Sequence, residues 1–320
     1  MMRIENVTAQ YQTITGPVVS VKDVDFTIRD DEIFGIAGES GCGKSTLLKV
    51  LYDVIQFPLE IAGGRVVLDY TDATGAHRTL QSGEIKNAWW DAISYIPQAA
   101  MSVLNPVYRI DEQFFELFRR HRKGSGEKAM KDRVVQYLNE LDLPVDILKS
   151  YPHQLSGGMR QRVVIAMATF LQPNMIFADE PTTALDVVVQ KSILMMLMEL
   201  QSRMHNTLVI VSHDMGVHYQ ITKRMGIMYS GSLMELGTTD EIFSNPLHPY
   251  TKMLIGALPK VGDKSTREGI PGGPPSLRNP PPGCRFAPRC KQARPECSQS
   301  VPKFVEVAPG RFAACHLLGK

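Results

Sequence analysis

The chain has 320 residues, of which 43% are hydrophobic, and a formal net charge of +2. It is longer than one average domain and apolar enough to bury a substantial core, which favours one large domain with an appendage. Because lysine, arginine, aspartate and glutamate are interspersed along it, the sequence offers no basic stripe of the kind that binds nucleic acid.

The sequence predicts that this chain does not itself cross a membrane. Its longest apolar stretches, near residues 163–171 and 193–197, fall short of the roughly 18 residues that span a bilayer. Residues 1–5 lack the basic and apolar blocks of a secretory signal, and the five cysteines do not suggest a disulfide framework. We therefore expect a reducing, cytoplasmic environment.

The opening third predicts β-structure around a glycine-rich turn. Short alternating runs at residues 3–7, 18–28 and 65–70 predict strands. An apolar, strand-like run at 33–37 is followed by a helix-like run at 46–52. Between these two runs lies Gly-Glu-Ser-Gly-Cys-Gly-Lys-Ser, which satisfies the phosphate-loop pattern G-x-x-x-x-G-K-[ST].

Each part of this pattern has a physical role in binding a nucleotide. The glycines permit positive φ, so that successive N–H groups can point at a phosphate beside a helix N-terminus. Lys44 should bridge the β- and γ-phosphates, and the Ser45 hydroxyl should ligate Mg²⁺. The alternative, an ordinary glycine turn, requires a rare chance match. The predicted nucleotide-binding residues here are Gly38, Ser40, Gly41, Cys42, Gly43, Lys44, Ser45 and Thr46.

A helical insertion is predicted after the β-rich region, at about residues 100–172. Apolar residues recur there at spacings of three and four between about 105 and 143. Within this range, Leu-Ser-Gly-Gly-Met-Arg-Gln at residues 155–161 leads into another helical run. The Ser156 hydroxyl and the free amides beside it form a second anion site at a helix N-terminus, and the alternative is a plain N-cap with a flexible Gly-Gly.

Two apolar strands that end in polar residues follow, at 175–179 and 208–213, with a helical stretch at 190–204 between them. Strand, helix and strand predict a parallel sheet. The first strand delivers Asp179 toward Mg²⁺, which it would hold through water, and Glu180 toward the attacking water as general base. Two solvated acids that cap a strand before a proline are the alternative.

The phosphate loop and the Leu-Ser-Gly-Gly-Met-Arg-Gln segment together resemble the ATPases of ABC systems. The resemblance implies an α/β fold: a P-loop NTPase core with an antiparallel β subdomain and a helical insertion. It also implies a head-to-tail dimer, in which the signature of one subunit completes the ATP site of the other. Ser156, Gly157 and Gly158 would then act in trans on the partner's ATP.

The same resemblance implies roles for four further residues. Gln98, between the strand 93–96 and the helical insertion, matches the Q-loop glutamine that senses Mg²⁺ and the attacking water. His213, at a strand end, matches the switch histidine that reaches the γ-phosphate, and Asp186 matches the D-loop along the dimer seam. Tyr11 matches the aromatic residue that stacks on adenine, with ordinary packing as the alternative.

The character of the chain changes toward its C-terminus, and we expect an ABC ATPase domain at 1–255 and a small irregular extension at 256–320. The extension is rich in proline and glycine and too poor in apolar residues to hold a core unaided. Its four cysteines are more economically explained as metal ligands, since a metal would supply the missing folding energy. These are Cys284, Cys290, Cys297 and Cys315.

Several segments resemble the ATP-binding subunits of dipeptide and oligopeptide (peptide/nickel) importers. They are residues 179–187, Asn-Pro-Leu-His-Pro-Tyr-Thr at 245–251, and the cysteine tail. The resemblance implies a second ATPase subunit, identical or different, two membrane permeases and an extracytoplasmic solute-binding protein, with this chain at the cytoplasmic face of the membrane. It implies peptides, oligosaccharides or nickel chelates as cargo, and a structural [4Fe–4S] cluster on the four cysteines; zinc and unligated thiols are the alternatives.

Two rival functions stay open from the sequence. A soluble ABC ATPase acting on nucleic acid or ribosomes would carry paired cassettes, a long coiled coil or a basic face, and none is visible in this sequence. A redox-responsive regulator built on the cysteine tail is the second rival. The first expectation is an ATPase that couples hydrolysis of ATP to solute import.

Overall fold

The computed structural model describes residues 1–98, 103–121, 127–258 and 269–318. The chain forms two compact units, and each is described by itself below. The first unit comprises Met1–Asp69, Thr79–Lys86 and Val209–Lys320, and the second comprises Tyr70–Arg78 and Asn87–Leu208.

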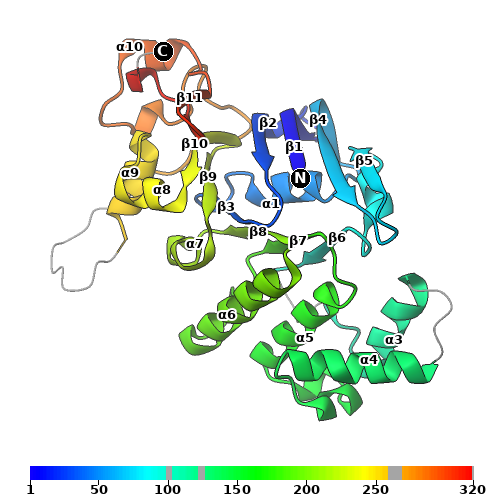
Figure 1. Ribbon diagram of the computed structural model, residues 1–320. Helices are drawn as coiled ribbons and strands as arrows, with labels where there is room; N and C mark the ends of the chain where they lie inside the picture. Colours follow the sequence, from blue (N-terminus) through cyan, green and yellow to red (C-terminus); the bar gives the residue numbers. More distant parts are fainter. Residues whose placement is uncertain (99–102, 122–126, 259–268, 319–320) are drawn as a thin grey trace. The chain divides into compact units, whose positions relative to one another are not determined.

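An antiparallel sheet opens the first unit, as the alternating sequence predicts. Strand β1 pairs with both β2 and β4, and buried side chains alternate along it because successive residues of a strand face opposite sides. Helix α1 contacts β1 and β2 and lies beside them in Figure 1. The strand order is β2-β1-β4-β5, with β1 at Met2–Tyr11, β2 at Val18–Ile28, β4 at Leu59–Thr71 and β5 at His77–Gln81; α1 spans Lys44–Leu51.

A second sheet in the same unit has the strand order β11-β12-β10-β9-β3-β8. Its central strand β3 is buried along its whole length and pairs in parallel with β9. Burial on both faces explains why β3 and β8 read as unbroken apolar runs. The strands are β3 Ile33–Ala37, β8 Thr207–Ser212, which enters this unit at Val209, β9 Arg224–Tyr229, β10 Ser232–Thr238, β11 Val305–Ala308 and β12 Arg311–Ala313.

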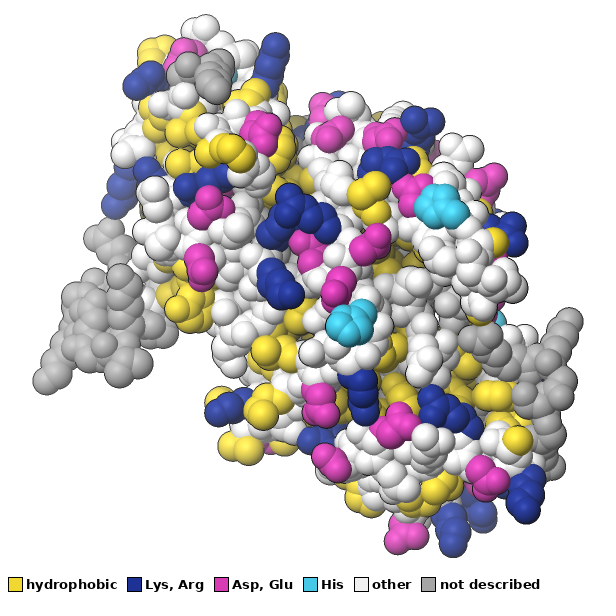
Figure 2. Space-filling model, in the orientation of Figure 1, with side chains coloured by type: hydrophobic (Ala, Val, Ile, Leu, Met, Phe, Trp, Pro, Cys, Tyr) yellow, Lys and Arg dark blue, Asp and Glu magenta, His cyan; other side chains and the backbone are white. Residues whose placement is uncertain are grey.

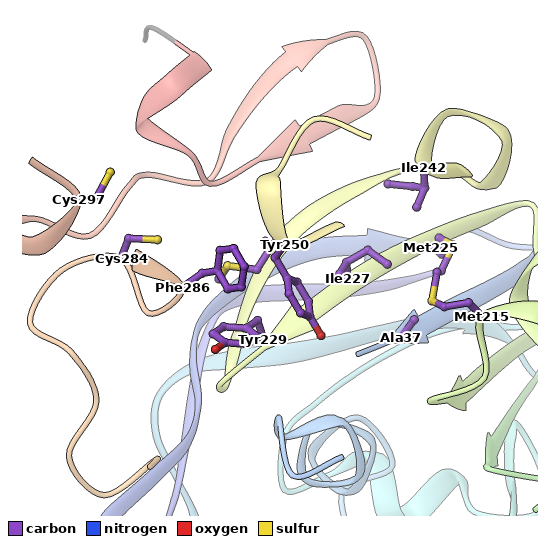
Figure 3. Close-up of a cluster of buried hydrophobic side chains, with 11 residues drawn as sticks. Ala37, Met215, Met225, Ile227, Tyr229, Ile242, Tyr250, Cys284, Phe286 and Cys297 are labelled. Carbon is purple, nitrogen blue, oxygen red and sulfur yellow. The ribbon is translucent and has the colours of Figure 1, made fainter. Parts of the chain in front are cut away.

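The C-terminal tail joins this unit in two ways. Strand β12 pairs antiparallel with β10, so that the tail extends the sheet. In addition, Phe286 packs its ring against Tyr229 and Tyr250, at centroid distances of 5.2 and 5.3 Å, and Figure 3 shows these three rings together. The tail therefore shares a core with the rest of the unit. The helices here are α7 Met215–Ile221, α8 Thr239–Ser244, α9 Pro249–Gly256 and α10 Pro295–Gln299.

The second unit is mainly helical. Within its described residues, β6 (Ile93–Ile96) and β7 (Met175–Asp179) pair in parallel. Phe170 centres an aromatic cluster, with Phe114 and Tyr137 packed edge-on against its ring. The helices are α3 Ile110–His121, α4 Glu127–Glu140, α5 Gly157–Thr169 and α6 Val187–Met204.

The predicted helical insertion is confirmed by α3 and α4, while its residues 99–102 and 122–126 lie outside the described residues. The α/β fold class is confirmed as well, since parallel strands, an antiparallel sheet and helices are all present. None of the helices within the described ranges is both long and apolar enough to span a bilayer.

Candidate nucleotide site

The predicted phosphate loop joins β3 to the N-terminus of α1 in the first unit. Its glycines have positive φ: 153° at Gly38, 76° at Gly41 and 102° at Gly43. A Cβ on Gly38 would lie 2.2 Å from the Met228 carbonyl oxygen, and one on Gly43 would lie 2.2 Å from that of Ser20. The fold therefore requires glycine at both of these positions, and the loop backbone stays uncovered by side chains there.

The Lys44 side chain forms hydrogen bonds with the backbone of the loop. Its Nζ donates hydrogen bonds to the carbonyl oxygens of Gly38 at 2.7 Å and Glu39 at 3.0 Å. The side chain is buried, whereas Ser45, one residue further into α1, is exposed. Cys42 lies within the loop and is buried, and this burial raises the pKa of its thiol. An ammonium held across the loop and an exposed hydroxyl in the first helical turn suit phosphate and metal binding.

Two other predicted residues of this unit, Tyr11 and His213, are placed by the elements next to the loop. The hydroxyls of Tyr11 and Thr46 are 3.3 Å apart, which holds the Tyr11 ring beside the start of α1. His213 is exposed and follows the carboxyl end of β8, the neighbour of β3 in the sheet. Ligands of parallel α/β sheets bind at this end of the strands. Adenine stacking by Tyr11 and γ-phosphate contact by His213 stay predictions.

Asp179 and Glu180 end strand β7 in the second unit. Asp179 is buried and accepts a hydrogen bond from the Tyr95 hydroxyl at 3.2 Å. Glu180 accepts two hydrogen bonds at one carboxylate oxygen, Oε2: from Gln98 Nε2 at 3.0 Å and from Thr183 Oγ1 at 2.9 Å. Its φ of 45° lies in the left-handed region, which residues other than glycine seldom adopt.

The structure thus brings Gln98 and Glu180 together, as their proposed shared task requires. It adds Tyr95 and Thr183, which the sequence analysis missed. Thr183 had a detectable signal, because a hydroxyl three residues after a strand-end carboxylate can turn back toward it; here its backbone N–H also bonds the Glu180 carbonyl at 3.1 Å. Tyr95 had none beyond its place on the strand next to β7.

Ser156 begins helix α5 in the second unit. Its hydroxyl caps the helix by accepting a hydrogen bond from the Met159 N–H at 3.2 Å. Gly158 is explained by packing, since a Cβ there would lie 2.6 Å from Val189 Cγ1 on α6. Gly157 is exposed, and a Cβ on it would meet nothing within 4 Å. A side chain at position 157 would therefore meet no steric obstacle among the described residues.

Asp186 also has a structural role of its own. It caps α6, accepting hydrogen bonds from Val188 N at 3.0 Å and Val189 N at 2.9 Å. The predicted action of Asp186 across a dimer seam stays a prediction.

The four tail cysteines line one small cavity of about 10 Å³. All four are free thiols, and Figure 3 shows Cys284 near Phe286, with Cys297 farther from that ring. Burial raises the pKa of Cys284, Cys290 and Cys315. Across the described ranges, no group of three or more histidine, cysteine, aspartate or glutamate side chains is arranged to hold a metal ion.

Comparison with known proteins gives two matches to family models. Residues 21–183 match the model described as ABC transporter, and residues 234–297 match the oligopeptide/dipeptide transporter C-terminal region. Among curated proteins, the chain is 38% identical to the dipeptide transport ATP-binding protein DppD of Bacillus subtilis, over 88% of this chain and 84% of that one. It is 36% identical to DppD of Lactococcus lactis, over 99% and 91%, and 36% identical to the oligopeptide transport ATP-binding protein OppD of Salmonella typhimurium, over 87% and 82%.

Solved structures give the same answer for the fold. The dimeric post-hydrolysis state of the ATP-binding cassette MJ0796 bound to ADP and Pi matches with a TM-score of 0.64 and 26% identity, covering 75% of this chain and 99% of that one. A second dimeric structure of MJ0796, a bacterial ABC transporter cassette, matches with a TM-score of 0.63 and 28% identity, at 75% and 99% coverage.

Proposed function

The chain belongs to the ABC transporter family, among the ATP-binding proteins of dipeptide and oligopeptide transport, and from that premise we propose that it powers oligopeptide import. It is an ATPase that uses ATP and Mg²⁺. The observation that carries the proposal is the match of residues 234–297 to the oligopeptide/dipeptide transporter C-terminal region, beside the ABC transporter match at residues 21–183.

In the proposed mechanism the phosphate loop binds the nucleotide. Backbone N–H groups at Gly41 and Gly43 receive the phosphates, and Lys44 moves from its loop carbonyls to the β- and γ-phosphates. Ser45, Asp179 and Gln98 are the residues that would hold Mg²⁺. When bound, Mg²⁺ supplies positive charge that offsets the charge on the β- and γ-phosphates.

Glu180 is the proposed general base. Its carboxylate would take the proton of the attacking water, and the hydrogen bonds from Gln98 and Thr183 support this role by fixing the orientation of the carboxylate. His213 would contact the γ-phosphate. Ser156, Gly157, Gly158 and Asp186 would complete the site of a second subunit, a role supported by the exposure of Ser156 and Gly157 at the N-terminus of α5 and by the dimeric MJ0796 cassettes.

We further propose that Cys284, Cys290, Cys297 and Cys315 hold a [4Fe–4S] cluster. Support comes from their shared cavity and from the soft sulfur donors that such clusters require. The side chains as they stand are not arranged to hold a metal ion, and the cavity of about 10 Å³ has room for about one water, so the four cysteines would have to move apart for a cluster to bind. The cluster would cross-link a tail that lacks a core of its own; counting iron, zinc and acid-labile sulfide in purified protein decides between cluster and zinc.

Permeases and a solute-binding protein are the proposed partners. In this scheme two ATPase subunits close on ATP, push on two membrane permeases and reopen after hydrolysis, while a solute-binding protein delivers cargo from outside the cell. The chain would lie at the cytoplasmic face of the membrane. On the face drawn in Figure 2, basic and acidic side chains are interspersed, a pattern that favours transport over the nucleic-acid alternative.

Affinity capture of the complex from detergent-solubilised membranes tests the function. We expect two integral membrane subunits to co-purify, and the captured complex reconstituted in vesicles to take up short peptides in an ATP-dependent way. Uptake of oligosaccharides or of a nickel chelate in place of peptides would revise the proposed cargo and still support the proposed importer function. Co-purification with ribosomes or nucleic acid, and no membrane subunits, would contradict the proposal.

A further inference from the structure

Arg289 of the C-terminal tail reaches the phosphate loop of the same unit. Its guanidinium forms a two-pronged pair with the Glu39 carboxylate, with Nη1 to Oε2 at 2.7 Å and Nη2 to Oε1 at 3.1 Å. The Arg289 side chain is 6% exposed and that of Glu39 is 25% exposed. Bidentate pairs of this kind are among the stronger hydrogen-bonded contacts in proteins, and this one is shielded from water.

The remaining donors of the guanidinium are engaged as well. Nε donates to the Pro271 carbonyl at 2.8 Å, Nη2 donates to the carbonyls of Ile270 and Gly272 at 3.2 and 3.1 Å, and Nη1 donates to the Tyr229 hydroxyl at 3.1 Å. The guanidinium also lies over the Tyr229 ring, 5.7 Å from its centroid. Arg289 is therefore fixed in place before any nucleotide arrives.

The backbone of Glu39 forms hydrogen bonds with two other loop residues and with Tyr250. Its backbone N–H donates to the Tyr250 hydroxyl at 3.1 Å. Its carbonyl oxygen accepts from Lys44 Nζ at 3.0 Å and from the Cys42 N–H at 3.2 Å. The position of Glu39 therefore affects the positions of Lys44 and of the loop backbone, the groups proposed to contact phosphate.

The negative charge of Glu39 makes its pairing with Arg289 important for nucleotide binding. Glu39 directly follows Gly38, so its carboxylate lies within a loop whose function is to bind a triphosphate. An unpaired carboxylate there would repel the incoming anion. We propose that Arg289 is a positioning residue for nucleotide binding: it neutralises and anchors Glu39, so that the C-terminal tail forms part of the ATP site. This rests on the assignment of the loop to ATP in the proposed function.

A matched control exists in the same unit. Arg224 Nη1 donates to both carboxylate oxygens of Glu32, at 2.9 and 3.0 Å, and both side chains are buried. Glu32 precedes β3, whereas the phosphate loop follows the other end of that strand. Breaking this pair removes a comparable buried contact without touching the loop.

The test is calorimetric titration of the intact chain with Mg²⁺ and the non-hydrolysable analogue adenylyl imidodiphosphate. We expect Arg289→Gln to weaken binding about tenfold, within the usual range of coupling between linked sites. Arg224→Gln should lower the melting temperature and bind within about twofold of wild type. The double variant Glu39→Gln/Arg289→Gln should recover to within about threefold, because it removes the bare carboxylate as well as its partner.

Wild-type affinity in Arg289→Gln, or no recovery in the double variant, would overturn the inference. Thermal unfolding of each variant identifies any loss through misfolding. If Arg289→Gln does not fold, Arg289→Lys replaces it: a lysine keeps the charge but loses the two-pronged geometry. Its expected loss is about threefold, and undiminished binding contradicts the inference. If wild type itself binds no nucleotide, the proposed function fails instead.

Discussion

The side-chain amide of Gln98 donates a 3.0 Å hydrogen bond to the Glu180 carboxylate. Gln98 follows β6 and Glu180 follows β7, and these two strands pair in parallel. Parallel pairing brings both strand ends to one edge of the sheet, so the contact follows from the register of the strands. Gln98, proposed to sense the attacking water, is therefore hydrogen-bonded directly to Glu180, proposed to deprotonate that water.

Replacing Glu180 by Gln should abolish steady-state hydrolysis while leaving ATP binding. The amide keeps the shape of the side chain and loses the base, a loss that typically costs 10² to 10⁴-fold in rate. Phosphate release measures the rate, and size-exclusion chromatography with ATP and Mg²⁺ should show a trapped dimer. The exposed Glu199→Gln variant on α6 serves as control and should hydrolyse ATP normally. Substantial turnover by Glu180→Gln would remove Glu180 from its proposed role.

Ser156→Ala should reveal two separable effects. Loss of the α5 cap should reduce the free energy of unfolding by about 1 kcal/mol. Loss of the hydroxyl at the partner's ATP should lower the hydrolysis rate far more than that modest destabilisation explains. Thr238→Ala is the matched control, because Thr238 caps α8 through the Glu241 N–H and has no proposed contact with nucleotide. Equal hydrolysis rates in the two variants would leave Ser156 as a cap only.

Cys297→Ser should remove iron and sulfide from the purified protein and lower the melting temperature. Cys297 is buried in the tail, and its carbonyl accepts a hydrogen bond from the Cys284 N–H at 2.8 Å, so loss of ligation there should loosen the segment around it. Cys42→Ser is the control, since Cys42 lies in the phosphate loop apart from the four-cysteine cavity. Unchanged metal content in Cys297→Ser would contradict the cluster proposal.

Stability should fall in mild acid because of His218. Burial of its ring lowers its pKa to about 4, and Nδ1 has no hydrogen-bond partner among the described residues. The unfolded chain, with an ordinary histidine pKa of about 6.5, binds the proton first. The contribution of neutral His218 is therefore fully present above pH 6.5 and declines as pH falls toward 4, by up to about 1.4 kcal/mol per pH unit.

Urea unfolding between pH 7.5 and 4.5 measures this dependence. His218→Gln should flatten it by the equivalent of one proton, while the exposed His77→Gln should keep the wild-type slope. His248, whose pKa burial lowers to about 3, adds a second proton of the same sign in every variant. An unchanged slope in His218→Gln would contradict the account.

Local patterns predicted β1 to β4, β6 to β8 and the phosphate loop, whereas β5 and β9 to β12 were not predicted. The apolar runs at 33–37, 93–96 and 175–179 coincide with β3, β6 and β7, because a buried parallel strand is apolar throughout and is bounded by turn residues. The conformation of the phosphate loop was predictable for a similar reason. Positive φ and close backbone approach restrict a position to glycine, so the glycines in the sequence indicate this backbone geometry.

Contacts between distant segments were not predictable. Arg289 and Glu39 are far apart in the sequence, and a single arginine in a proline-rich tail carries no periodic signal. The core around Phe286 was missed for the same reason, since its partners Tyr229 and Tyr250 belong to β9 and α9. A count of apolar residues within the tail alone underestimates what the tail can bury.

The central claim is that each ATP site is shared, with the phosphate loop of one subunit facing the signature of another. Mixing two inactive variants of this chain, Lys44→Ala and Ser156→Arg, tests it most directly. In a mixed head-to-tail dimer one site receives both mutations and the other receives none, so we predict recovery of about a quarter of the wild-type ATPase rate at equal amounts, from random pairing with independent sites. A mixture as inactive as its components would contradict the shared-site account.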